Sequence, residues 1–188
     1  MKYYIGIDVG GSSIKAALVD EKGNISHNWK AKTPTSLERF YLLIDNIVNI
    51  ATDKQQVEGI SMSLPGAVDS NTGIIGGSSA LPYIHGPNIK KDLEIRTNLR
   101  VEMENDANCA ALAEVWIGNA SDVEDSMFVV SGTGIGGAVI KDKKIHRGVH
   151  LHGGEYGYEI MIFDEVNKKF STWSDVGSTI ALVNRVAK

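Results

Sequence analysis

The feature that most constrains the fold is a three-strand pattern that occurs twice in the chain. Near the start, "KYYIGIDV" predicts a buried strand, "GGSS" a tight turn, "SIKAALVD" a second strand and "ISHNWKAK" a third. The same order of strand, glycine turn, strand, turn and strand returns in "DSMFVVSG", "GGAVIKD" and "KKIHRG". This is a weak internal repeat, of architecture rather than of letters. Two such meanders predict two related α/β domains that face one another across a cleft.

The segment between the two meanders alternates helical and strand patterns. Thr35 and Glu38 have capping-box spacing, and apolar residues then recur at helical intervals to Ile50, which predicts a helix. "VEGISMSL" predicts a buried strand that ends at Pro65-Gly66, and a long loop rich in Gly, Ser and Pro follows to about Asn88. We then expect a short helix over 89–97, a strand in "VEMEN" and an alanine-rich helix.

The polar stretch "NASDVED" has the composition of a connection between domains. It places the domain boundary after Gly118, with one domain over 1–118 and the other over 119–188. The first domain then holds the first glycine turn and Asp106, and the second holds the other glycine turn.

Composition narrows the classes of function. The chain has 188 residues, 43% of them hydrophobic, and a formal net charge of −4, so it lacks the basic surface that nucleic-acid binding usually requires. Its one cysteine, Cys109, lies in the alanine-rich run and is expected to be a small core residue. Neither a leader pattern nor an apolar run of spanning length is present, which predicts a cytoplasmic protein with no membrane partner.

The first glycine turn, "DVGGSSIK", has the residues of a phosphate-binding loop. Gly10 and Gly11 let backbone N–H groups point into a concavity, Ser12 adds a hydroxyl, and Lys15 adds a positive charge. Asp8 precedes the turn and is suited to hold Mg²⁺, or its water shell, against phosphates. The alternative is a plain hairpin in which glycine is chosen for a positive φ.

The second glycine turn, "SGTGIGG", contains Gly132, Gly134 and Gly137 in GxGxxG spacing. A dinucleotide-binding fingerprint requires a helix after the glycines, whereas "GGAVIKDKKI" predicts a strand and a turn. We therefore interpret Gly132, Thr133 and Gly134 as a second phosphate-binding loop and expect no nicotinamide cofactor.

An adjacent Asn105 and Asp106 mark the junction between the strand and the alanine-rich helix in "VEMENDANCAALAEVWIG". An Asp at such a junction is most often an N-cap. The alternative is a functional carboxylate at a cleft, because active sites of open α/β sheets lie outside the carboxyl ends of the strands.

Five motifs in order resemble the ROK family of sugar kinases, in the actin-like ATPase superfamily: "DVGGSSIK", "SLPGAVD", "ENDANCAALAE", "SGTGIGGAV" and "RGVHLHGGEYGY". The resemblance implies an actin-like ATPase (ribonuclease H-like) fold that uses ATP and Mg²⁺. It also implies that Asp106 is the general base, which takes a proton from a sugar hydroxyl, usually O6. Phosphoryl transfer needs positioning, a metal at the phosphates and such an Asp.

The resemblance further implies which residues contact the sugar: Gly66, Ser79, Asn105, Asp106 and Glu155. Family members commonly carry Glu-x-Gly-His followed by cysteines that bind a structural zinc. This chain has Glu155-Tyr156-Gly157-Tyr158 and no cysteine after it, so we expect no zinc site and expect Tyr158 to line the sugar site. The family's later sugar-binding Glu is also missing, with "STWSDVGST" in the matching region.

With Tyr158 in place of the histidine and without the zinc-binding cysteines, the chain is similar to the family's β-glucoside kinases, which phosphorylate O6 of a glucosyl unit. We favour that substrate over glucose or an N-acetylhexosamine such as N-acetylmannosamine. A second hypothesis is a catalytically weak sugar-binding or regulatory ROK protein, because the sugar motif is altered.

ROK kinases resembling this chain are longer, so the second domain is expected to be incomplete and ATP binding weak. Val176, Ile180, Val183 and Ala187 would form an apolar stripe on one helical face. An exposed apolar stripe of this kind usually packs against another surface, so we expect a homodimer or another protein partner.

Overall fold

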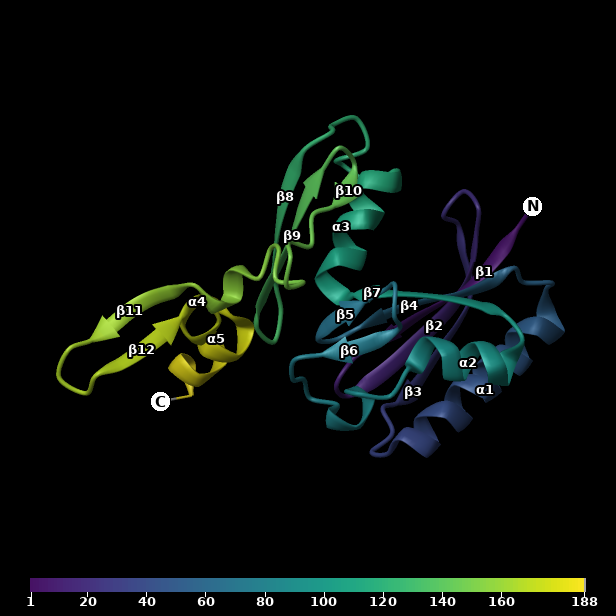
Figure 1. Cartoon of the computed structure of the whole chain (residues 1–188), viewed down its shortest axis with the longest axis horizontal. Coiled ribbons are helices and arrows are strands. Elements are labelled where there is room, and N and C mark those ends of the chain that lie inside the picture. The colour runs from purple at the N-terminus through teal and green to yellow at the C-terminus, as the bar shows by residue number, and fades with distance from the viewer. Residues whose placement is uncertain (188) are drawn as a thin grey trace. The chain divides into compact units, whose positions relative to one another are not determined.

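The computed structural model describes residues 1–187, which form a mixed α/β protein (Figure 1). The chain divides into two compact units, Met1–Asp106 and Ala107–Lys188. The boundary expected from the sequence lay after Gly118, at the other end of the alanine-rich helix.

A five-stranded sheet in the order β3-β2-β1-β4-β7 forms the centre of the first unit. Its strands are β1 (Tyr3–Val9), β2 (Ser13–Asp20), β3 (Ile25–Lys32), β4 (Gly59–Leu64) and β7 (Arg100–Asn105). The first three are antiparallel neighbours, whereas β4 and β7 run parallel to β1. The first meander predicted from the sequence is therefore present.

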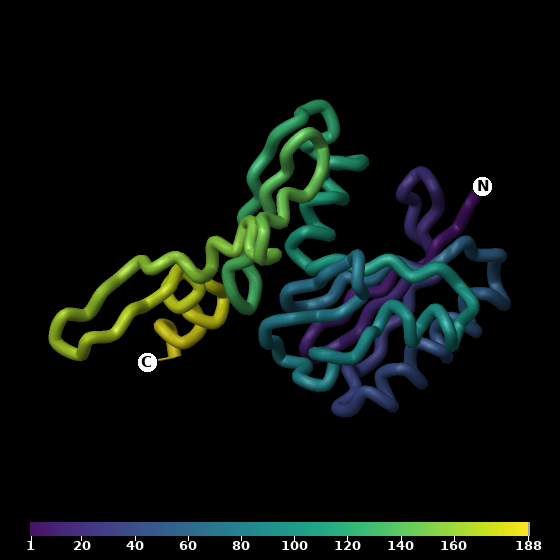
Figure 2. Tube along the Cα trace, viewed as in Figure 1, coloured from purple at the N-terminus to yellow at the C-terminus, as the bar shows by residue number. Residues whose placement is uncertain are grey.

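Two helices pack side by side in the first unit, α1 (Leu37–Lys54) and α2 (Ile89–Thr97), as Figure 2 shows. The apolar face of α1 carries Phe40 and Ile44, both fully buried in the core. Ser36, and not Thr35, caps this helix by accepting a hydrogen bond from the Arg39 amide. The helix therefore starts one residue later than expected, N3 is Arg39, and the capping box expected at Thr35 and Glu38 is wrong.

The segment after β4 was expected to be a long loop, and that expectation is wrong. It contains a hairpin of two three-residue strands, β5 (Ala67–Asp69) and β6 (Ile74–Gly76), and the 3-10 turn η1 (Pro82–Ile84). Val68 and Ile75 are buried in the core, which explains why the hairpin forms. Its strands are too short for a clear alternating pattern.

The second unit contains a three-stranded antiparallel sheet, β10-β9-β8. Helix α3 (Asp106–Ile117) leads into it, followed by β8 (Ser126–Ser131), β9 (Ile135–Lys141) and a short β10 (Lys144–Ile145). The second meander predicted from the sequence is thus also present. The buried cluster here is small and consists of Ala111, Ala138 and Ile140.

Of the remaining elements of the second unit, only a helix near the end of the chain was predicted. The 3-10 turn η2 (Tyr156–Tyr158) precedes a hairpin of β11 (Ile160–Asp164) and β12 (Lys169–Thr172). Two short helices follow, α4 (Trp173–Gly177) and α5 (Thr179–Val186), separated by Ser178. Val176 therefore lies on a different helix from Ile180 and Val183, so the single stripe expected there is wrong.

Across residues 1–187, every helix is too short or too polar to span a membrane.

Candidate active site

The candidate site of the first unit lies where three parallel strands end. The register aligns Asp8 of β1 with Ser63 of β4, and Leu64 of β4 with Asn105 of β7. Asp106 follows Asn105 directly and is the first residue of α3. Open α/β sheets place ligands outside the carboxyl ends of their strands, so this edge is the expected position for a site.

Asp8 is held in place by two neighbours. Ser63 Oγ donates a hydrogen bond to Oδ1 at 3.0 Å, and Lys15 Nζ lies 3.4 Å from Oδ2. The Lys15 and Asp8 side chains are 62% and 51% exposed, so their ion pair adds little to stability. An oriented, accessible carboxylate next to a cation is better explained by a binding role.

The first glycine loop is fixed by a hydrogen bond of its own and by two from Thr33, the residue after β3. Gly10 N–H donates to the Ser13 carbonyl at 3.1 Å, and Thr33 donates from Oγ1 to the Gly10 carbonyl at 2.6 Å and from N to the Ser12 carbonyl at 3.2 Å. Neither Gly10 nor Gly11 has a positive φ. A Cβ on Gly11 would instead lie 3.1 Å from the Ala80 Cβ, so close packing, and not backbone conformation, favours glycine there.

Three residues expected to contact sugar meet in the first unit. Asn105 Nδ2 donates to the Gly66 carbonyl at 3.1 Å, and Gly66 has a φ of +105°, which favours glycine. Ser79 Oγ lies 2.8 Å from His85 Nε2 and also accepts the Leu81 amide at 3.2 Å. A Cβ on Gly66 would lie 3.0 Å from His85 Cε1, so one imidazole joins Ser79 to Gly66.

The second glycine loop is built differently, from residues far apart in the sequence. Gly132 N–H donates to the Gly134 carbonyl at 2.9 Å, which closes the loop around Thr133. Ile135 N–H donates to Ser174 Oγ of α4 at 3.0 Å, and Thr179 N–H of α5 donates to the Gly132 carbonyl at 3.0 Å. The loop is thus held at both ends by the two short helices.

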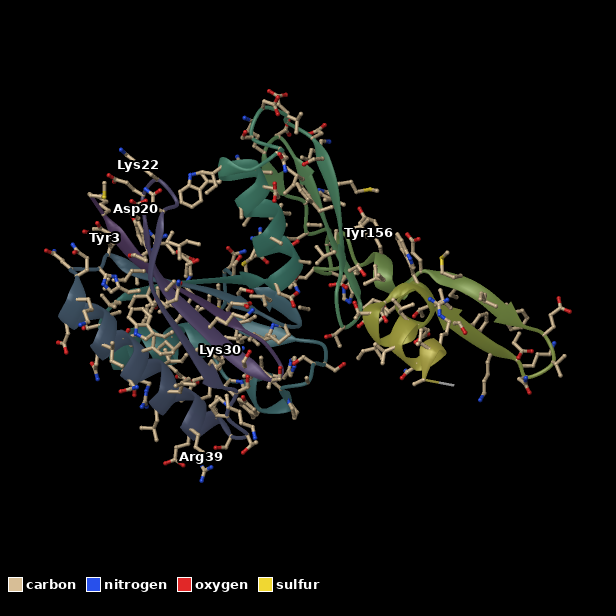
Figure 3. All side chains as sticks on the ribbon, turned by 180° about the vertical axis from the view of Figure 1, so that it is seen from behind. Tyr3, Asp20, Lys22, Lys30, Arg39 and Tyr156 are labelled. Atoms are coloured by element: carbon tan, nitrogen blue, oxygen red, sulfur yellow. The ribbon has the colours of Figure 1, made fainter. Side chains whose placement is uncertain are left out.

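Glu155 directly precedes the turn η2 of the second unit, and Tyr158 is the last residue of that turn. Tyr156, between them, packs its ring against Gly137 of β9, where a side chain has no room. Figure 3 shows Tyr156 where the strands of this unit adjoin α4 and α5. Its hydroxyl is buried without a hydrogen-bond partner among the described residues, and burial, helped by Glu159, raises the pKa of the phenol.

Tyr158, expected to line a sugar site, is 70% exposed. Its role stays a prediction.

Sequence reasoning missed four of the residues that shape these loops: Ser63, His85, Ser174 and Thr179. Ser63 lies beside Asp8 because β1 and β4 pair in parallel. A strand predicted from the sequence does not show which strand it pairs with. Ser174 lies 39 residues from its partner Ile135, so no local pattern links them. In the described residues, no three His, Cys, Asp or Glu side chains come together as metal ligands; the zinc question stays a prediction.

A comparison of the chain with known protein families identifies its family. A family model described as the ROK family matches residues 4–169, so the chain belongs to that family, and its fold is the α/β fold of the actin-like ATPases.

Three relatives illustrate the similarity. A β-glucoside kinase of Listeria monocytogenes is 37% identical over 80% of this chain and 51% of its own length. The crystal structure of a ROK family protein from Streptococcus pneumoniae TIGR4 in complex with sucrose has a TM-score of 0.85 and 39% identity, covering 98% of this chain and 61% of that one.

A ROK family glucokinase from Streptomyces griseus, in complex with glucose and AMPPNP, has a TM-score of 0.84 at 31% identity, covering 97% of this chain and 59% of that one. The chain spans about half the length of the curated relatives it matches.

Proposed function

We propose that the protein transfers the γ-phosphoryl group of ATP to a sugar hydroxyl, O6 of a glucosyl unit in a β-glucoside or hexose. The observation that carries this proposal is the strand edge of the first unit, where Asp8 lies near the end of β1 and Asn105 and Asp106 lie at the end of β7, two parallel strands on either side of β4. A carboxylate suited to a metal and a carboxylate suited to a base then lie in one site, together with an amide.

Asp106 is the proposed general base. It is exposed at the first turn of α3, so its carboxylate is accessible to a ligand while the helix fixes its backbone. It would accept the proton of the sugar hydroxyl as that oxygen attacks phosphorus. Asn105, tied to Gly66, would orient the same sugar through its amide.

Asp8 fits the Mg²⁺ that accompanies ATP, since its carboxylate oxygens are hard donors, oriented by Ser63 and Lys15. When bound, the ion would neutralise charge on the phosphates. We assign the phosphate contacts to the loop of Gly10, Gly11, Ser12 and Lys15, and to the loop of Gly132, Thr133 and Gly134. The relatives named as sugar kinases, one of them bound to AMPPNP, support ATP as the donor.

A second candidate is a sugar-binding or regulatory protein with weak activity. The sequence Glu155-Tyr156-Gly157-Tyr158, where the family commonly has Glu-x-Gly-His, is the observation that favours it. In that case calorimetry would detect sugar binding while no ADP is released. N-acetylmannosamine belongs in the same screen as an alternative substrate.

The test is a coupled ADP-release assay with glucose, cellobiose, N-acetylmannosamine and fructose, in wild type and Asp106→Asn. Loss of a general base lowers turnover by about 10²- to 10⁴-fold, and sugar affinity should change little. Asp53→Asn, an exposed residue of α1, is the matched control and should keep full turnover. Unchanged turnover in Asp106→Asn would remove this residue from the mechanism.

A further inference from the structure

His85 lies in the centre of the proposed sugar contacts, although no motif singles it out. Its Nε2 is 2.8 Å from Ser79 Oγ, and its Cε1 faces Gly66, the residue whose carbonyl accepts the Asn105 amide. The imidazole therefore connects Ser79, Gly66 and Asn105 into one packed group within the first unit.

The other ring nitrogen of His85 has an unusual environment. Nδ1 is buried and has no hydrogen-bond partner in the part of the chain that the structure describes. An unsatisfied buried polar atom costs free energy, and an apolar side chain of similar size would avoid that cost. Stability therefore does not explain why residue 85 is a histidine. The hydrogen bond between His85 and Ser79 does explain it.

The hydrogen-bonding capacity of Ser79 is limited. A hydroxyl has one donor and two acceptor sites. The Leu81 amide already occupies one acceptor site. If His85 Nε2 carries a proton and donates it, the second acceptor site of Ser79 is filled and the Ser79 hydroxyl proton remains for a ligand. If Nε2 is unprotonated, it accepts the hydrogen bond from the Ser79 hydroxyl, and no donor remains for a ligand.

The orphaned Nδ1 decides between these cases. A neutral imidazole carries its proton on one nitrogen only. Among backbone groups, buried N–H donors without a partner are rarer than under-satisfied carbonyl acceptors, and we apply the same order to the imidazole. A proton on Nε2 leaves Nδ1 as the bare acceptor, which is the less costly arrangement, so Nε2–H donates to Ser79 Oγ.

We propose that His85 is a positioning residue that makes Ser79 a hydrogen-bond donor to an oxygen of the bound sugar. The proposal rests on the proposed function, in which Ser79 contacts the sugar. The ligand group it fits is any sugar oxygen that accepts a hydrogen bond, including hydroxyl and glycosidic oxygens. His85 acts through Ser79 and does not need to touch the ligand.

The experiment measures sugar binding directly, by calorimetry with glucose and with cellobiose. His85→Leu removes the donor, keeps an apolar side chain and should weaken binding by about 3- to 10-fold, the range for one lost hydrogen bond. His85→Gln keeps an N–H donor on a chain of similar reach and should restore affinity to within about 2-fold of wild type. Equal losses in both variants would overturn the proposal.

A double-mutant cycle with Ser79→Ala tests whether His85 acts through Ser79. If it does, His85→Leu should cause no further loss of sugar affinity once Ser79 is alanine. Additive losses would show an independent role and refute the proposal. In the coupled assay, His85→Leu should raise KM for the sugar while leaving KM for ATP unchanged.

Tyr83→Phe is the matched control. Tyr83 lies in η1 beside His85 and donates to the Pro34 carbonyl at 2.7 Å, so this variant loosens the same turn without touching Ser79. Its sugar affinity should equal that of wild type, and a loss as large as in His85→Leu would mean that any loosening of the turn suffices.

The binding cycle also separates this proposal from the proposed function. Coupling between His85 and Ser79 in calorimetry, with no ADP release, would keep the proposal and reject the kinase. If wild type binds neither glucose nor cellobiose, Ser79 is not a contact for such sugars and the proposal fails.

Discussion

The two units share a strand meander with a glycine turn, but they support it by different means. In the first unit the sheet packs on a large buried cluster that includes Phe40, Ile44 and Leu64. In the second unit the buried cluster is Ala111, Ala138 and Ile140, joined by partly buried neighbours such as Phe128. A similar topology is thus stabilised by large aliphatic and aromatic side chains in the first unit and mostly by small side chains in the second.

The glycine loops repeat this difference. The first is held by Thr33, which follows the third strand of its own meander. The second is held by Ser174 and Thr179, which belong to helices outside the meander. The first loop is therefore a local product of its sheet, whereas the second depends on contacts that form across a long stretch of chain.

The largest expected effect concerns the core of the first unit. Phe40→Ala should lower the free energy of unfolding by about 3–5 kcal/mol, because it leaves a cavity among fully buried side chains. Hydrogen exchange followed by mass spectrometry should show protection lost in β1, β4 and β7 and kept in β8 and β9. Leu42→Ala, on the same helix but 56% exposed, is the control and should change little.

Equal loss of protection in both units after Phe40→Ala would mean that they unfold together. The contrast between the two cores would then have no energetic meaning.

A smaller effect is expected from a close approach in the second unit. In Gly137→Ala the new methyl would meet the Tyr156 ring and lie 2.7 Å from the carbonyl oxygens of Gly154 and Phe128. Overpacking of this kind costs about 1–3 kcal/mol, measurable by denaturant unfolding. Gly132→Ala, where nothing lies within 4 Å of an added methyl, should have nearly wild-type stability.

The smallest effects compare the two loops directly. Thr33→Val removes one hydroxyl hydrogen bond to the first glycine loop, and Ser174→Ala removes the two that its hydroxyl makes with the Ile135 backbone beside the second; each bond is worth about 0.5–1.5 kcal/mol. If both loops contact ATP, each variant should raise KM for ATP by about 2- to 10-fold and leave KM for the sugar unchanged. An unchanged KM for ATP in one variant would assign the phosphate contacts to the other loop alone.

The sequence predicted the elements whose pattern is local. Helix α1, with its apolar residues at helical spacing, and α2 over 89–97 were both expected, as were the strands of the two meanders. The hairpin of β11 and β12 was not. Its apolar run "IMIF" does not alternate with polar residues, and the strands pair through Phe163 and Phe170 instead of a buried face.

The residues of the candidate site were predictable only where a single residue, such as an Asp at the end of a predicted strand, indicates a function by itself. Asp8 and Asp106 stand at the ends of strands that the sequence reveals. His85 contacts Ser79 across a turn, and Ser174 contacts Ile135 at a distance of 39 residues along the chain; no periodicity in the sequence marks such contacts. At Gly11 the structure lacks the positive φ of the plain-hairpin alternative and shows tight packing against Ala80, which the sequence did not reveal.

The short hairpin of β5 and β6 closes on itself. Asp69 accepts hydrogen bonds from the Asn71 and Thr72 amides and from the Thr72 hydroxyl, which seals the turn at its exposed tip. The turn is also tied to the start of α2, because Asn88 Nδ2 donates to the Thr72 carbonyl at 2.8 Å and Lys90 Nζ to the Ser70 carbonyl at 3.3 Å. Since Asn88 is the N-cap of α2, a tag or a longer loop inserted around Asn71 would disturb the start of that helix as well as the turn.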